Sequence, residues 1–203
     1  LDNARRMVFD RGLLTLYAIG FCAMGAFVAA FNGLSFRLAA PPFDLAVGTA
    51  SLVFVTYLIG SFSSPWAGRL ASRYGFRRVV PAALTIFAAG VALTLVPDLT
   101  FVVIGVGVIT FGFFAAHGTT SGWVTARAAN KGRGTGLAGS LYLTFYYAGS
   151  SVCGAVAGTA WSLGGWAAVA GLAGSLVAVA LLLALSMRRV PLVPAHDYDQ
   201  PPP

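Results

Sequence analysis

Long apolar runs alternate with short polar stretches along this chain. Measured against the roughly 20 residues that a helix needs to cross a bilayer, several runs are long enough. These runs cover residues 12–31, 46–67, 79–96, 100–119, 136–160 and 164–187. The stretches between them are short and carry most of the charged residues, together with prolines and glycines that favour turns. The pattern predicts an all-α membrane protein with six transmembrane helices.

The composition agrees with this reading and limits the class of partner. The 203 residues are 58% hydrophobic and 9% charged, whereas soluble domains carry about a quarter charged residues. A net charge of +7 could also suit a nucleic-acid-binding protein. Here, however, the basic residues lie at the ends of apolar runs rather than on a polar surface. We therefore expect a lipid bilayer as partner and no nucleic acid.

The basic residues also predict how the chain is threaded through the membrane. With six crossings, Arg37 falls on one side and the other basic residues fall on the opposite side, which is the cytoplasmic side by the positive-inside rule. The residues on that side are Arg5, Arg6, Arg11, Arg69, Arg73, Arg77, Arg78, Arg127, Lys131, Arg133, Arg188 and Arg189. This predicts a cytoplasmic segment at 1–11, a six-helix bundle at 12–187 and a cytoplasmic, proline-rich tail at 188–203, which we expect to be disordered.

The connection between the second and third runs is the most distinctive stretch. Residues 68–78 read G-R-L-A-S-R-Y-G-F-R-R, and their glycines suit positions where a helix ends and the backbone turns with positive φ. The stretch resembles the signature cytoplasmic loop of the major facilitator superfamily, roughly G-x-L-A-D-R-x-G-R-[RK], except that Ser72 stands at the acidic position. The alternative to this resemblance is that the arginines only set the membrane topology. The resemblance implies an inner-gate role for Gly68, Arg69, Arg73, Gly75, Arg77 and Arg78.

The resemblance extends over most of the chain. Residues 16–21, 111–117, 121–124 and 141–147 are similar to the C-terminal half of bacterial YNFM-type efflux permeases. This implies helices seven to twelve of a major-facilitator transporter, in a bacterial inner (plasma) membrane. Three crossings followed by three more would form two inverted repeats, as in half of that fold. The chain begins with leucine, and we expect it to belong to a longer protein whose N-terminal six-helix half is the missing partner.

A few polar side chains inside the apolar runs are candidates for chemistry. His117 lies near the end of the fourth run, and a histidine can exchange protons near neutral pH, although a purely structural hydrogen bond is the alternative. Arg37, at the outer end of the first run, is expected to contact headgroups. No metal, cofactor or catalytic residue is indicated. Tyrosine side chains could line a substrate cavity, the alternative being an aromatic belt at the interface. The tyrosines are Tyr142, Tyr146 and Tyr147, with Tyr17 and Tyr57 as weaker candidates.

Together these features predict secondary active transport by alternating access, and not an enzyme. The resemblance implies efflux of a small molecule, with protons as the expected coupling ion (an antiporter). The alternative is a stand-alone or truncated six-helix module with a structural or dimerisation role. An intramembrane hydrolase would need a buried nucleophile with a base or paired carboxylates. The apolar runs contain one histidine and no Asp or Glu, and the sequence has no G-x-S-x-G motif.

Overall fold

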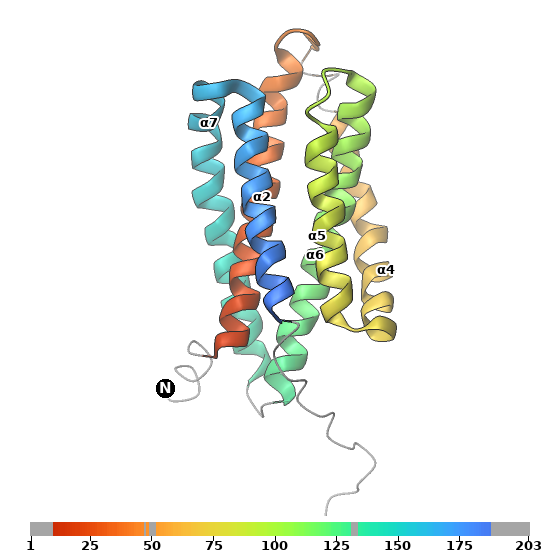
Figure 1. The fold of residues 1–203 in the computed structure, drawn as a ribbon, viewed down its shortest axis with the longest axis vertical. Coiled ribbons are helices and arrows are strands. Elements are labelled where there is room, and N and C mark those ends of the chain that lie inside the picture. The colour runs from red at the N-terminus through yellow and green to blue at the C-terminus, as the bar shows by residue number, and fades with distance from the viewer. Residues whose placement is uncertain (1–9, 47, 49–51, 131–133, 188–203) are drawn as a thin grey trace, which may run out of the picture.

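The computed structural model describes residues 10–46, 48, 52–130 and 134–187, and this part of the chain consists of helices joined by short turns. Figure 1 shows the helices standing together along the long axis of the molecule. The predicted tail at 188–203 and almost all of the predicted N-terminal segment lie outside the described residues. The elements are α2 (Arg11–Ala39), the 3-10 helix η1 (Leu52–Tyr57), α4 (Leu58–Tyr74), α5 (Phe76–Leu93), α6 (Leu99–Asn130) and α7 (Thr135–Ser186).

Four of the described helices, α2, α5, α6 and α7, are long and apolar enough to cross a membrane. The predicted second crossing corresponds to η1 and the 17-residue α4. The two last predicted crossings both lie in α7, whose 52 residues include non-helical backbone at Gly164 and Gly165. A straight helix of that length would measure roughly 78 Å, against a bilayer core of about 30 Å. The chain instead turns back at this break, at the top in Figure 1.

The helix ends differ from the prediction. The expected connection at 161–163 is helical, and the break follows it at Gly164 and Gly165, where a φ of 57° at Gly165 favours glycine. Likewise α2 continues to Ala39 and α6 to Asn130, into stretches that had been assigned to connections. The reason is packing, because Leu34 and Leu38 in the first extension and Val124 and Ala128 in the second are buried.

Glycines bring neighbouring helices into close contact. A Cβ atom at Gly112 of α6 would lie 2.5 Å from the backbone nitrogen of Phe87 in α5. On the opposite side of the bundle, a Cβ atom at Gly20 of α2 would lie 2.6 Å from the ring of Tyr142 in α7. Small residues at helix contacts are typical of membrane proteins, where van der Waals packing rather than water exclusion holds helices together.

The start of α2 is bonded to the end of α6. Asp10 caps α2 by accepting a hydrogen bond from the backbone N–H of Leu13 at 2.9 Å. The same carboxylate oxygen lies 2.9 Å from Nε of Arg127, and the two side chains are 4% and 13% exposed. A buried ion pair therefore joins two elements that are far apart in the sequence. The sequence analysis had not singled out Asp10 and had counted Arg127 only as a topological charge.

Candidate substrate cavity and gate

Three of the predicted site residues lie together between α6 and α7. His117 Nδ1 is 3.0 Å from the hydroxyl oxygen of Tyr142, within hydrogen-bond distance. The ring centroids of His117 and Tyr146 are 4.6 Å apart, and those of Tyr142 and Tyr146 are 6.2 Å apart. Tyr142 is almost fully buried and the other two are partly buried. We call His117, Tyr142 and Tyr146 the His–Tyr cluster.

The helix that carries His117 extends further than the sequence indicated. His117 had been placed near the end of an apolar run that stops at residue 119. Because α6 continues to Asn130, roughly 20 Å of helix follows His117. His117 is therefore not at an end of α6. Its position near one end of the membrane-crossing run stays a prediction, since its partner Tyr142 is the eighth residue of α7 and the contact of Tyr142 on α2, Gly20, is the tenth residue of that helix.

Aromatic rings extend the cluster towards η1. Phe113 stacks on His117 with ring centroids 6.0 Å apart, and Phe27 of α2 stacks on Phe113 at 4.0 Å. The ring of Tyr57 meets Phe27 edge-on at 5.5 Å. Tyr57 is 39% exposed, so this end of the row reaches the surface of the chain. The structure thus connects Tyr57 with the His–Tyr cluster through a continuous row of rings.

The two remaining tyrosines are placed differently. Tyr17 is 1% exposed and its ring stacks on Phe145 at 5.5 Å, so it is packed inside the bundle. Tyr147 is 61% exposed, although its ring stands perpendicular to that of Tyr146 at 5.2 Å. Neither residue lies within the His–Tyr cluster.

The His–Tyr contact can hold or pass a proton. The phenol of Tyr142 can donate its O–H to a neutral Nδ1, or an N–H at Nδ1 can donate to the phenol oxygen, depending on the tautomer. In both arrangements the other ring nitrogen of His117 is left to bind a further group. A histidine with one nitrogen fixed in this way is a suitable proton carrier.

The predicted gate stretch at 68–78 is two helix ends rather than a loop. Gly68, Arg69 and Arg73 lie inside α4, and Arg77 and Arg78 lie in the first turn of α5. Only Gly75 is non-helical, with a φ of 84°, and its N–H donates to the carbonyl of Ala71 at 2.8 Å. The expectation of positive φ is confirmed at Gly75. It is wrong at Gly68, because residues 68–74 continue α4.

The same helix, α4, explains the hydrogen bond of Ser72. Its hydroxyl donates to the carbonyl of Gly68 at 3.1 Å, one turn earlier, so it does not cap a helix. The arginines of the stretch differ in how they interact with the helix dipoles. Arg73 lies favourably in the last turn of α4, whereas Arg77 and Arg78 lie at the positive end of α5. That position costs each of them about 0.3–1 kcal/mol, which favours a role outside α5 itself.

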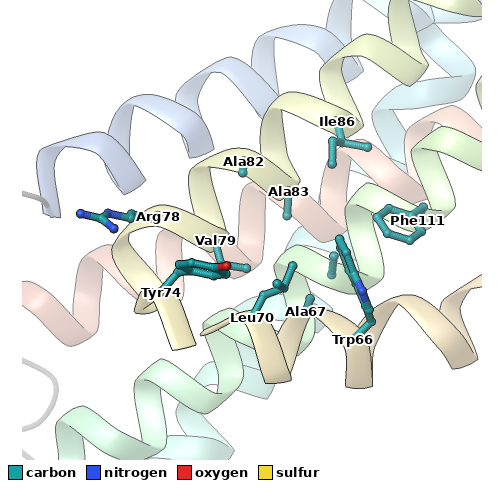
Figure 2. Close-up of a pocket in the computed structure, with 11 residues that line it drawn as sticks. Trp66, Ala67, Leu70, Tyr74, Arg78, Val79, Ala82, Ala83, Ile86 and Phe111 are labelled. Carbon is teal, nitrogen blue, oxygen red and sulfur yellow. The ribbon is translucent and has the colours of Figure 1, made fainter. Parts of the chain in front are cut away.

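An apolar groove begins beside these arginines. It has a volume of about 380 Å³ and lies between α4, α5 and α6. Figure 2 shows Tyr74 and Arg78 at one end and Trp66, Ile86 and Phe111 towards the other. Within the described residues, neither Arg69, Arg73 nor Arg78 has a carboxylate within 4 Å. The guanidinium carbon of Arg73 lies 5.2 Å from the ring centroid of Tyr74.

Arg37 was assigned to lipid headgroups, and the structure corrects this. It lies in the last turn of α2, is 8% exposed, and donates from Nη2 to the carbonyl of Val96 at 3.0 Å. The ring centroids of Phe43 and Trp166 lie 5.5 and 5.0 Å from its guanidinium carbon. In the sequence, Arg37 stood out as a single cation between apolar stretches. The sequence did not show that α2 continues far enough to bury this side chain.

Comparisons with known proteins identify the family. Residues 7–201 match the model of the Major Facilitator Superfamily. The chain is 40% identical over 175 residues to an uncharacterised MFS-type transporter, YybF, of Bacillus subtilis, a match that covers 86% of this chain and 42% of that protein. It is 37% identical over 180 residues to the inner membrane transport protein YnfM of Escherichia coli, covering 89% of this chain and 42% of YnfM.

The matched part of the chain thus covers 42% of the length of each of these two relatives. An uncharacterised transporter of Buchnera aphidicola (strain Sg) is also 34% identical over 178 residues. No solved structure shows significant similarity to the chain. The family match covers nearly every residue and agrees with a bundle of long apolar helices and with the arginine-rich stretch, which confirms the resemblance stated from the sequence. The chain belongs to the major facilitator superfamily, a family of membrane transporters.

Proposed function

We propose that this chain is the C-terminal half of an alternating-access transporter that exports a small molecule in exchange for protons. The observation that carries the proposal is the His–Tyr cluster, which puts a proton-carrying side chain and phenol hydroxyls together between α6 and α7. Substrate sites of such transporters lie near the middle of the membrane, between two bundles. In this proposal His117 carries the coupled proton, while Tyr146 and Tyr57 contact the substrate.

The proposed missing partner is an N-terminal six-helix bundle. The chain spans 42% of YybF and YnfM, so those relatives have length for a second bundle. Large apolar side chains are exposed on α4 and on the first part of α7, including Phe62 at 77% and Val152 at 54%. These faces suit packing against the other bundle. The inner gate would use Gly68, Arg69, Arg73, Gly75, Arg77 and Arg78. Its arginines would meet acids of the partner half, and among the described residues Arg69, Arg73 and Arg78 have no carboxylate within 4 Å.

We further propose that the protein resides in a bacterial inner membrane with both termini in the cytoplasm, and that it has six crossings in two inverted repeats. Single cysteines at Ser72→Cys, Gly136→Cys and Pro42→Cys test the threading, since all three positions are exposed. The native Cys22 and Cys153 are buried and would be replaced. In intact cells, an impermeant thiol reagent should label position 42 only. Labelling of either of the other two positions would contradict the topology.

Transport itself is tested in proteoliposomes containing the full-length protein and a pH-sensitive dye inside. We expect an imposed pH gradient to drive uptake or release of the substrate, and substrate addition to move protons. His117→Ala should abolish the proton movement, whereas His196→Ala, a matched change outside the described residues, should leave it intact. Substrate-driven proton flux that persists undiminished in His117→Ala would contradict the proposed role of the cluster.

A further inference from the structure

A second pocket lies at the opposite end of α2 from its Asp10 cap. It has a volume of about 390 Å³ and lies between the end of α2, the turn that joins α5 to α6, and the break in α7. Its walls include Arg37, Phe43, Leu95, Pro97, Trp161 and Trp166, and we call it the Arg37 pocket. The His–Tyr cluster meets α2 at Gly20. Arg37 lies roughly 25 Å further along the same helix, so the two sites are separate.

We propose that the Arg37 pocket binds a small organic anion, a carboxylate attached to a flat apolar body. The first reason is the state of the guanidinium. Arg37 is more than nine-tenths buried, its Nη2 has a protein acceptor in Val96, and its Nε–H is buried without an acceptor among the described residues. Within the same residues no carboxylate lies within 4 Å of it.

Burial of the Arg37 guanidinium costs free energy when no ligand is bound. A buried charge normally has a counter-charge or a full set of hydrogen bonds, because removing it from water is expensive. The rings of Phe43 and Trp166 attract the cation but accept none of its N–H hydrogen bonds. A bound anion would supply the missing counter-charge, together with an acceptor for the N–H groups that the guanidinium turns to the pocket.

The second reason is the match between the pocket and a carboxylate. A guanidinium presents parallel N–H donors that fit the two oxygens of one carboxylate. A single arginine balances one negative charge, which favours a monoanion over a phosphate dianion. The other wall residues are all uncharged and include aromatic rings, prolines, Leu95 and Ala167, which suit an apolar body. The volume also falls within the roughly 300–1,000 Å³ of known small-molecule pockets.

Occupancy of the pocket would strengthen one end of the bundle. Arg37 already connects α2 with the α5–α6 turn through Val96. Trp166, just after the break in α7, donates from Nε1 to the carbonyl of Thr94 in the same turn at 3.0 Å. An anion held by Arg37 between these walls would therefore contact all three segments at once.

The test is equilibrium binding of radiolabelled benzoate to the purified full-length protein in detergent. We expect saturable binding that chloride and the neutral analogue benzamide do not displace. Hydrogen bonds to charged groups predict that Arg37→Gln weakens benzoate binding roughly ten- to a hundredfold. Arg11→Gln, which removes an exposed arginine from the other end of α2, should bind benzoate like the unaltered protein.

A second variant guards against misfolding of Arg37→Gln. Ala167→Phe fills the pocket from an exposed wall position and leaves the bond between Arg37 and Val96 in place. It should also weaken benzoate binding at least tenfold while eluting as folded protein in gel filtration. The proposal is overturned if the unaltered protein shows no saturable binding, if benzamide or chloride competes equally, or if Ala167→Phe binds benzoate normally. The measurement involves no transport, so failure of the export proposal would not affect it.

Discussion

The buried pair Asp10–Arg127 allows the most direct energetic test of this fold. The informative changes are Asp10→Asn and Arg127→Gln, separately and together. Asparagine is as good an N-cap as aspartate, so Asp10→Asn can keep the hydrogen bond to the N–H of Leu13 and remove only the charge. Arg127→Gln removes the other charge and leaves a polar side chain near the same place.

The expected magnitudes follow from the burial of the two side chains, which are 4% and 13% exposed at an N–O distance of 2.9 Å. Removing one member of a buried pair leaves an uncompensated charge and typically costs 3–5 kcal/mol. Because Arg127 retains some contact with solvent, we expect the lower end, about 3 kcal/mol for each single variant. The double variant leaves no buried charge unpaired and should lose about 4 kcal/mol rather than 6, a coupling of about 2 kcal/mol.

The assay is reversible unfolding of the full-length protein in mixed detergent–SDS micelles, followed by circular dichroism. Arg11→Gln is the matched control, since it removes an exposed cation next to Asp10 and should change the free energy of unfolding by less than about 0.5 kcal/mol. If the two single changes add within about 0.5 kcal/mol in the double variant, the pair does not couple α2 to α6. The reasoning from burial would then be refuted.

Three further changes test other parts of the structure. Gly112→Ala should lower the free energy of unfolding by about 1–3 kcal/mol because its Cβ meets the backbone of α5. The control Gly171→Ala, in open space, should raise it by up to about 1 kcal/mol. Thermal melting measures both variants against the unaltered protein. Gly75→Ala should cost about 1–2 kcal/mol in detergent unfolding because its φ is 84°. Tyr142→Phe should cost about 1 kcal/mol by losing its bond to the neighbouring histidine, and the exposed Tyr147→Phe should change little in the same measurement.

The sequence predicted where helices lie better than where they end. Run length against bilayer thickness located the apolar cores of α2, α5 and α6 and the two parts of α7. Run length misplaced the helix ends because stretches with polar residues were assigned to connections, although tertiary packing buries some of these residues. Arg37 and Thr120 are examples, at 8% and 1% exposed. Hydropathy records the cost of burying such side chains in lipid but not the protein partners that reduce this cost.

The candidate site was predicted in part. His117, Tyr142 and Tyr146 were recognisable because polar groups are rare in apolar runs, and two of them share one helix face at a spacing of four residues. The contact between α6 and α7 was not readable, since it depends on how two helices pack. The bond between Asp10 and Arg127 spans 117 residues. The N-cap signature of Asp10 was present in the sequence, but nothing in it indicated the partner.

Arg127 and Arg37 suggest how the bundle would move. At one end, Arg127 holds the start of α2 through Asp10. At the other, Arg37 holds the last turn of α2 to the α5–α6 turn through Val96. Charge-assisted hydrogen bonds are stronger than neutral ones, so α2 is held to α6 at one end and to the α5–α6 turn at the other. The His–Tyr cluster lies between these two points. In the transporter proposed above, these contacts would favour movement of the whole bundle against its partner over rearrangement within it, and alternating access requires the first kind of motion.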